Sequence, residues 1–106
     1  MTDPRVDTSL MPSATTTVRH DEEHQRYELL LDGAVIGIAD YRIEGDVVVF
    51  PHTEIRADLR GNGHGAELVQ AALDDVRPTG RHIVPLCWYV AQFVAENPDY
   101  ADLLVH

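Results

Sequence analysis

Residues 47–86 read VVVFPHTEIRADLRGNGHGAELVQAALDDVRPTGRHIVPL, and most of the predicted fold follows from them. Residues 47–50 are a continuous apolar run, which is typical of a strand buried on both faces. After a glycine-rich loop, apolar residues recur three and four positions apart, as on the buried side of an amphipathic helix: Leu68, Val69, Ala72, Leu73 and Val76. Residues 78–80, Pro-Thr-Gly, stop that helix, and residues 82–86 are a second apolar strand. The stretch therefore predicts a strand, a loop, a helix and a parallel strand.

The residues before this stretch have the pattern of antiparallel strands. Tyr27, Leu29 and Leu31 alternate with polar residues, and the turn dipeptide Asp32-Gly33 separates them from a second strand at residues 35–43. A turn at residues 44–46 leads into residues 47–50, so we expect that strand to be central. Pro51 follows it, and because proline has no N–H to donate, we expect a bulge or a local opening of the sheet there.

The two ends of the chain have weaker patterns. Residues 1–17 are rich in Thr, Ser, Pro and Asp without an apolar period, so we expect a disordered tail before one domain at residues 18–106. Val90, Phe93 and Val94 predict a second, shorter helix at about residues 88–96, whereas residues 100–105 have no assignable pattern. The expected fold class is α/β (α+β), with a mixed, mostly antiparallel sheet, a parallel strand-helix-strand unit and two main helices.

Composition excludes several classes of protein. The 106 residues carry 18 acidic and 8 cationic side chains, which gives a formal net charge of −10, and every cation is an arginine. Without lysine there can be no Walker-type phosphate loop and no Schiff-base enzyme, and the negative charge disfavours nucleic acid as a partner. The single cysteine excludes an intramolecular disulfide framework, and no apolar run is long enough to cross a membrane. We expect a cytoplasmic protein, as a monomer or a weak dimer.

The loop before the helix, residues 60–65, has glycine at every second position from Gly61 to Gly65. With few side chains in the way, successive N–H groups can converge on an anion at the positive end of the helix, for which phosphate is the natural ligand. The alternative is a flexible turn that binds nothing. A dinucleotide site would need an acidic residue at the end of the next strand, which residues 81–89 do not contain, and a nucleoside triphosphate site would need lysine. What remains is a pyrophosphate held by backbone amides, as in coenzyme A.

Four motifs along the chain resemble one family. Residues 60–66, RGNGHGA, resemble the Arg-x-x-Gly-x-Gly/Ala pyrophosphate loop of the GNAT superfamily of acyl-CoA-dependent N-acetyltransferases. In the short, stand-alone branch of that superfamily, a His-Thr-x-hydrophobic strand end precedes the loop. A Pro-x-Cys-x-Tyr-hydrophobic segment follows the helix, and a Pro-x-Tyr-x-Asp-Leu tail closes the chain. Residues 52–55, 85–90 and 98–103 match these motifs, so the resemblance covers roughly residues 27–104.

The resemblance implies where acetyl-CoA would bind. It implies that the strands ending near Ile55 and Leu86 splay apart into a V, which would take the pantetheine arm. The backbone of Thr53, Glu54 and Ile55 would hydrogen-bond that arm and the acyl carbonyl. The pyrophosphate would be held by Arg60, Gly61, Asn62, Gly63, His64, Gly65 and Ala66. Pro51 argues independently for a disturbed ladder at the same place.

The acceptor site is expected to be open. The chain lacks the two helices that wall this site in larger members of the superfamily, because the Asp32-Gly33 turn leaves no room for them. The charge of −10 favours a cationic acceptor, such as an amine-bearing small molecule or a basic peptide.

Acetyl transfer to an amine needs a base for the amine and a proton source for the departing thiolate. His52 can be the base, since an unperturbed histidine has a pKa of about 6.5; the alternative is a hydrogen-bonded structural histidine. The resemblance implies that Cys87 faces the thioester together with His52, and a thiol at a helix N-terminus can have a lowered pKa. Cys87 could carry the acetyl group, shuttle a proton or line the tunnel, or it could be an inert buried cysteine. Tyr89 could instead protonate the thiolate.

Three further residues or motifs have secondary roles. By the two-residue period of a strand, Glu54 shares a face with His52 and could orient it. His64 is expected to face solvent. Residues 20–24, HDEEH, differ from the zinc motif HExxH and precede a strand, so we expect no metal site. The alternatives to an enzyme are a non-catalytic acetyl-CoA-binding module or sensor that acts through a protein partner, and an interaction protein with no ligand.

Overall fold

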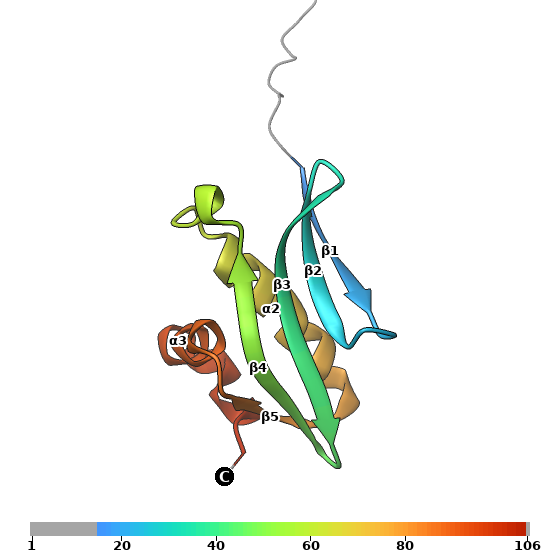
Figure 1. The fold of residues 1–106 in the computed structure, drawn as a ribbon. Helices are drawn as coiled ribbons and strands as arrows, with labels where there is room; N and C mark the ends of the chain where they lie inside the picture. The colour runs from blue at the N-terminus through green and yellow to red at the C-terminus, as the bar shows by residue number, and fades with distance from the viewer. Residues whose placement is uncertain (1–14, 106) are drawn as a thin grey trace, which may run out of the picture.

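A computed structural model describes residues 15–105 (Figure 1). One mixed sheet has its five strands in the order β1-β2-β3-β4-β5. The strands are β1 (Thr16–Asp21), β2 (Arg26–Leu31), β3 (Ala34–Glu44), β4 (Val47–Ile55) and β5 (His82–Pro85). Neighbours among the first four strands are antiparallel, whereas β5 runs parallel to β4. The predicted fold class and the parallel strand-helix-strand unit are confirmed.

Two α-helices and three short 3-10 helices complete the described chain. The α-helices are α2 (His64–Val76) and α3 (Trp88–Glu96), and the 3-10 helices are η1 (Ala57–Leu59), η2 (Arg77–Thr79) and η3 (Pro98–Leu103). The second predicted helix thus has the expected bounds, and the unassigned end of the chain is largely η3. Strand β5 ends one residue before the predicted end at Leu86, because the chain leaves β4 after Pro85.

Strand β1 begins at Thr16, so it includes two residues that the sequence pattern had placed in the tail. Thr16 pairs with Leu31 of β2, and the Thr15 and Asp32 main chains are joined by an N–H···O bond of 3.0 Å. Thr16 and Thr17 are β-branched and suit a strand, although no apolar period marks them in the sequence. Thr15 precedes the strand, and residues 1–14 of the expected tail lie outside the described residues.

The strand connections are short. Asp32 and Gly33 have φ values of 50° and 86°, as a two-residue hairpin turn with a right-handed strand twist requires. Residues 22–25 join β1 to β2 in a four-residue turn. Neither connection holds a helix, and so the face of the sheet opposite α2 has no helical wall from these segments.

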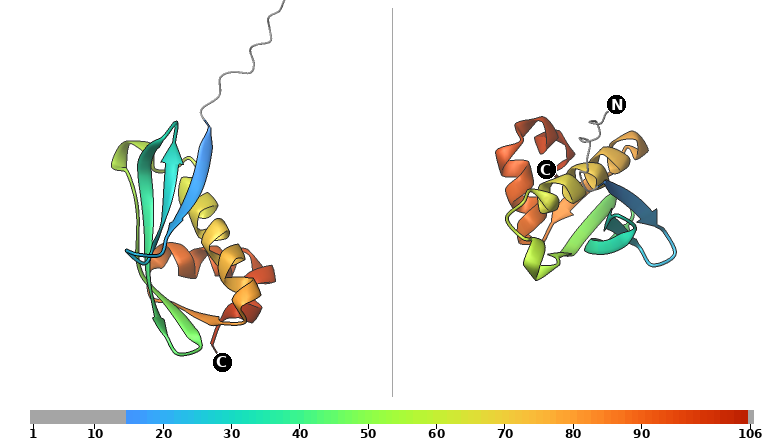
Figure 2. Two further views of the ribbon diagram at one scale, coloured as in Figure 1. Left: turned by 90° about the vertical axis from the view of Figure 1, so that its right-hand side faces the viewer. Right: turned by 90° about the horizontal axis from the view of Figure 1, so that it is seen from above.

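A single core lies between the sheet and the two α-helices, which cover the same side of it (Figure 2). Leu68 and Leu73 of α2 are fully buried in the same cluster as Leu29 and Phe50 of the sheet, and α3 contributes Val90 to it. Burial of such side chains stabilises the fold by roughly 1.5–3 kcal/mol each. Within residues 15–105, no helix has the length and hydropathy to cross a membrane.

Strand β4 changes its face at Pro51. Arg42 pairs with Val49 and Asp40 pairs with His52, so two residues of β4 stand opposite one of β3, which is a β-bulge. Before the bulge Val48 and Phe50 face the core, and Val49 is also buried, so the prediction of burial on both faces is confirmed. After the bulge it is Thr53 and Ile55, at odd positions, that are buried.

Candidate functional site

The two parallel strands part immediately after Phe50. Their last pair is Phe50 with Pro85, and the Cys87 N–H donates to the Phe50 carbonyl at 3.0 Å, which closes the apex. Beyond it, β4 continues to Ile55, while the segment that follows β5 turns into α3 (Figure 1). The bulge predicted from Pro51 therefore coincides with an opening that has β4 as one arm and the start of α3 as the other. We call it the β4–α3 opening.

Two residues of β4 direct main-chain groups into this opening. The Arg56 N–H donates to the Ile36 carbonyl at 2.7 Å, so in this register the main chains of His52 and Glu54 also face β3. Alternate residues of a strand point their N–H and C=O groups to opposite edges, which leaves those of Thr53 and Ile55 on the open side. Arg60 Nε donates to the Ile55 carbonyl at 3.0 Å. The Thr53 N–H and C=O and the Ile55 N–H remain for a ligand.

The glycine loop brings the N-terminus of α2 to the same end of β4. Gly61 and Gly63 have φ values of 84° and 81°, a backbone conformation that disfavours residues with a Cβ atom. Gly63 is the N-cap and has no side chain to cap the helix, so the N–H groups of His64, Gly65 and Ala66 lack intrahelical acceptors. Such N–H groups, at the positive end of a thirteen-residue helix, form an anion site.

Gly65 is needed for a different reason, which is the approach of Tyr89. A Cβ atom at Gly65 would lie 2.6 Å and 2.7 Å from two carbons of the Tyr89 ring. Tyr89 belongs to α3, so its ring packs directly on the first turn of α2 and joins the two helices beside the opening. Trp88, which is 67% exposed, packs edge-on against the same ring.

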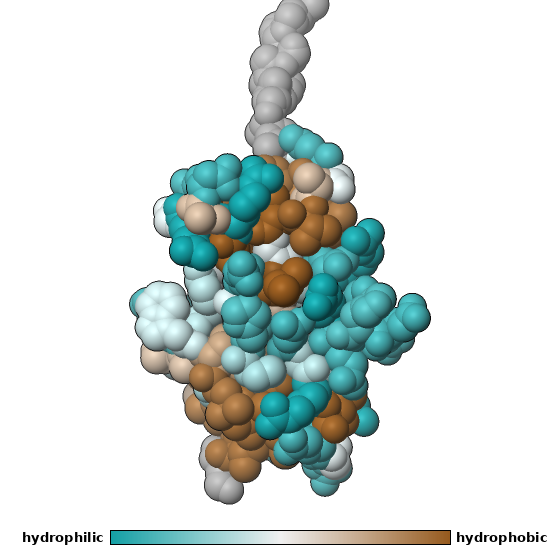
Figure 3. All heavy atoms as spheres, in the orientation of Figure 1, coloured by the Kyte–Doolittle hydropathy of each residue, from teal (hydrophilic) through white to brown (hydrophobic). Residues whose placement is uncertain are grey.

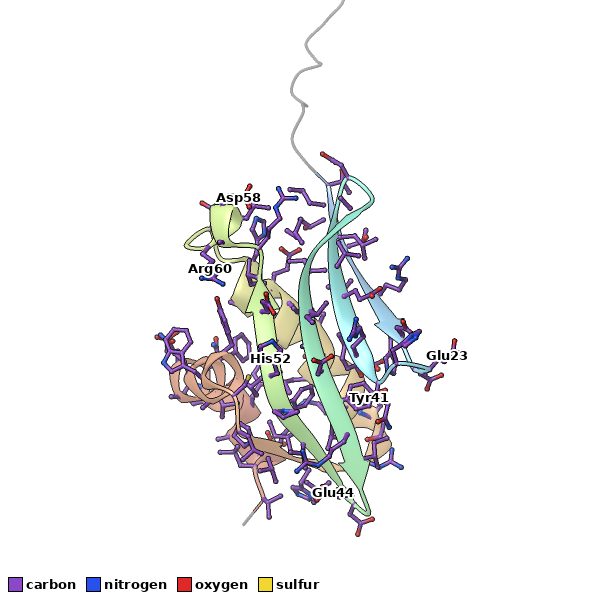
Figure 4. The ribbon with its side chains drawn as sticks, viewed as in Figure 1. Glu23, Tyr41, Glu44, His52, Asp58 and Arg60 are labelled. Carbon is purple, nitrogen blue, oxygen red and sulfur yellow. The ribbon has the colours of Figure 1, made fainter. Side chains whose placement is uncertain are left out.

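Two arginines lie near the anion site, but both have partners. Arg60 is held through Nε by the end of β4, and the rest of its guanidinium can still donate to an anion (Figure 4). Arg56 donates twice to Asp58, and this carboxylate raises the pKa of Arg56 while its own pKa is lowered. Asn62 is used within the loop, where its side chain donates to the Leu59 carbonyl at 3.3 Å. The helix end and Arg60 are therefore the main positive groups.

His52 lies on the outer face of the sheet, away from α2 (Figure 4), and Glu54, two residues further along β4, shares that face. His52 Nε2 is 3.1 Å from a Glu54 carboxylate oxygen, so the expectation that they share a face is confirmed. Both side chains are more than half exposed. This face is polar across its middle (Figure 3), where Arg26 and Asp40 form a further ion pair at 3.3 Å.

Cys87 is buried on the core side of the opening. Its Sγ lies 3.0 Å from Thr53 Oγ1 and accepts the Val90 N–H at 3.5 Å, which makes Cys87 the N-cap of α3. Thr53 is itself 7% exposed, so the hydroxyl and the thiol form a buried polar pair across the two arms. Any group held at the Thr53 main chain would lie beside this pair.

The structure brings only some of the expected residues together. His52 and Cys87 each lie two residues beyond the apex on opposite arms, but their side chains are on opposite sides of β4 and bond to different partners. The expectation that His64 faces solvent is wrong, because its side chain is only 17% exposed and lies 3.7 Å from Glu67. The contact of Gly65 with Tyr89 and that of Thr53 with Cys87 join distant segments, and no sequence pattern predicts them.

Comparison with known proteins agrees with this geometry. The family model for GCN5-related N-acetyl-transferases matches residues 26–103. Protein NATD1 of Xenopus tropicalis is 30% identical over 93 residues, which span 85% of this chain and 84% of that protein. The human Protein NATD1 is 31% identical over 84 residues, or 76% of this chain and 74% of that protein.

A solved structure has the same fold. The NMR solution structure of a GCN5-like protein from Staphylococcus aureus aligns with a TM-score of 0.66 at 18% identity, over 84% of this chain and 87% of the other. Together with the family match over most of the chain, these observations identify the protein: it belongs to the GCN5-related N-acetyltransferase family.

Proposed function

We propose that the protein is an acetyl-CoA-dependent N-acetyltransferase that transfers an acetyl group to a primary amine in a direct, ternary-complex reaction. The observation that carries the proposal is the coincidence of three features at one end of β4. These are the unpaired strand edge beyond the apex, the open N-terminus of α2 and the buried Thr53–Cys87 pair.

The residues present fit acetyl-CoA. Its pantetheine arm has amide groups that can bond to a strand edge, and the free groups of Thr53 and Ile55 are such an edge. Its pyrophosphate needs N–H donors, and the first turn of α2 supplies them without lysine. Phosphate can approach Gly61 and Gly63 closely, because these residues have no side chain and the space that a Cβ atom would occupy is open.

In this proposal His52 takes the proton of the amine. Its Nε2 atom is next to Glu54, whose carboxylate orients the ring. The amine nitrogen forms a bond to the acetyl carbon while the carbon–sulfur bond breaks, and the departing thiolate takes up a proton. The Tyr89 hydroxyl and the Cys87 thiol are the candidate donors of this proton. The Thr53 hydroxyl, 3.0 Å from Cys87 Sγ, could return a proton to Cys87. The acceptor is a cationic small molecule or a basic peptide, to which the net charge of −10 is complementary.

The tight β1–β2 and β2–β3 connections favour one alternative. Because neither carries a helix to wall the acceptor side, the protein could bind acetyl-CoA without catalysis and report it to a protein partner. This alternative predicts acetyl-CoA binding that is unchanged in a His52 variant, with no turnover to lose.

The test is release of free CoA thiol from acetyl-CoA in the presence of amines, polyamines and basic peptides, with mass spectrometry of the acetylated product. We expect release above the rate without protein, and a loss of about 10²–10⁴-fold in kcat in His52→Gln. His24→Gln is the matched control, because His24 is also an exposed histidine paired with a nearby carboxylate, Asp21 at 2.8 Å. Absence of turnover across the panel, or equal rates in the two variants, would contradict the catalytic proposal.

A further inference from the structure

A second cavity lies on the paired side of the apex, under the C-terminal end of α2. It has a volume of about 460 Å³ and takes walls from β1, β2, β3, β4 and α2. Val48 lines it where β4 still pairs with β5 through Ile83, so the β4–α3 opening begins beyond it. The aromatic and ionisable residues of its wall are His20, Glu22, Tyr27, Tyr41, Asp75 and Arg81. We call it the α2 C-terminal pocket.

Two hydrogen bonds, one ion-pair contact and a stacked ring pair hold one part of this wall. His20 Nε2 lies 2.6 Å from the Tyr41 hydroxyl, and His20 Nδ1 lies 3.3 Å from Oδ2 of Asp75. The Tyr27 hydroxyl donates to the same Oδ2 atom at 2.6 Å. The His20 and Tyr27 rings are stacked, with centroids 4.3 Å apart. The four side chains come from three strands and one helix, so the wall is formed before any ligand arrives.

The free groups of this wall are mainly acceptors. A carboxylate can only accept, and the Tyr41 hydroxyl shares one hydrogen bond with His20 Nε2. Oδ1 of Asp75 and the Glu22 carboxylate have no hydrogen-bond partner within residues 15–105. The Tyr41 oxygen keeps a free lone pair. The main donor on the wall is Arg81, whose Nε already faces the Gly45 carbonyl at 3.5 Å.

Two carboxylates, Glu22 and Asp75, and one guanidinium, Arg81, line the pocket, so the field in it favours a cation. The negative end of α2 points here, and its last turn holds no basic side chain. Burial and the nearby carboxylates Glu22, Asp75 and Asp21 raise the pKa of Tyr41, in that order, which reports a negative potential at its hydroxyl. Arg77, just after the helix, is turned away and donates to Asp102.

The floor of the pocket is apolar. Ile43, Val48 and Val76 line it together with the Tyr27 and Tyr41 rings. Aromatic rings and aliphatic side chains favour a ligand with an apolar body, while the acceptors above them need N–H donors.

We infer that the α2 C-terminal pocket binds a small organic ammonium ion, with its N–H groups on Asp75 and Glu22 and its apolar body on the floor. This site is distinct from the opening proposed for acetyl-CoA and does not depend on that proposal. Residues 20–24 thus gain a role other than the zinc motif that they resemble, since His20 bonds to Tyr41 and lies 3.3 Å from Asp75, while His24 pairs with Asp21.

The test uses benzylamine, which is protonated at pH 7, and benzyl alcohol as its uncharged analogue, in an NMR titration of the full chain at constant ionic strength. We expect saturable shifts of the Ile43, Val48 and Val76 amide signals with benzylamine, and binding at least roughly fivefold weaker for benzyl alcohol. Shifts of Gly61, Gly63 and Gly65 instead, or equal affinity for the two probes, would overturn the inference.

Two variants test the residues. Asp75→Asn keeps an oxygen for the Tyr27 hydroxyl but removes the charge, and we expect it to weaken benzylamine binding roughly fivefold. Glu22→Gln, in an exposed turn where no packing depends on it, should weaken binding in the same direction even if Asp75→Asn disturbs the fold. Asp74→Asn is the matched control, because Asp74 carries the same charge one residue away and bonds to Tyr100 instead. Equal weakening in Asp74→Asn and Asp75→Asn would mean attraction by net charge alone and would refute the site.

Discussion

Because of the contact between Gly65 and Tyr89, we expect Gly65→Ala not to stabilise the protein, although helix propensity alone predicts that it would. Gly65 lies in the first turn of α2 without a positive φ, so replacement by alanine should by itself stabilise the helix by about 0.5–1 kcal/mol. The new Cβ atom, however, would stand 2.6 Å from the Tyr89 ring, whereas ordinary carbon contacts are about 3.5–4.0 Å. The ring must therefore move by about 1 Å, and overpacking of this kind costs about 1–3 kcal/mol.

A double-mutant cycle in urea separates the two effects. We expect Gly65→Ala to be stabilising in a Tyr89→Ala background and neutral or destabilising in the wild type. The coupling free energy should be about 1–3 kcal/mol. Gly63→Ala is a suitable control, since its φ of 81° is strained for alanine but a Cβ atom there would meet nothing within 4 Å. Its effect should not depend on residue 89. If Gly65→Ala stabilises the protein equally in both backgrounds, the packing assigned to Tyr89 is wrong.

Three further predictions concern the core and the helix ends. Burial and, second, the bond to Asp75 raise the pKa of Tyr27, so above pH 10 the folded state keeps the hydroxyl proton that the unfolded state loses. The free energy of unfolding should therefore fall by about 1.4 kcal/mol per pH unit above pH 10. Alkaline unfolding should show a shallower fall in Tyr27→Phe. Leu73→Ala should cost about 2–5 kcal/mol in urea unfolding, because Leu73 is fully buried. Cys87→Ala removes the N-cap acceptor of α3 and should cost about 1 kcal/mol in the same assay, with Cys87→Ser closer to the wild type; equal losses would argue against capping.

The order of elements could be predicted because each has a local cause. The apolar period of residues 68–76 requires a helix, the Asp32-Gly33 pair favours the turn it forms, and Pro51 has no N–H to donate to a ladder. These signals lie within a few residues of one another and do not depend on the rest of the fold. The backbone part of the site could be predicted in the same way, because the conformations of Gly61 and Gly63 are local.

The side-chain part of the site could not be predicted from these patterns. The bulge at Pro51 reverses which positions of β4 face the core, so Thr53 becomes buried and meets Cys87 from a segment 34 residues away. His52 is directed to the outer face by the same reversal and is separated from Cys87. His64 is covered at the start of α2, although it reads as a polar residue in an exposed loop.

Acetyl-CoA binding at the glycine loop is the central proposal, and a titration of the melting temperature with acetyl-CoA tests it. At about 100 times Kd, binding should add about 2.7 kcal/mol, which for a domain of this size raises Tm by roughly 10–20 °C. Gly63→Glu places a carboxylate where the pyrophosphate would bind and should abolish the shift, whereas Gly63→Asn, which tolerates a positive φ without charge, should retain most of it. A wild-type Tm that does not change with acetyl-CoA, or a shift of the same size in Gly63→Glu, would contradict the account.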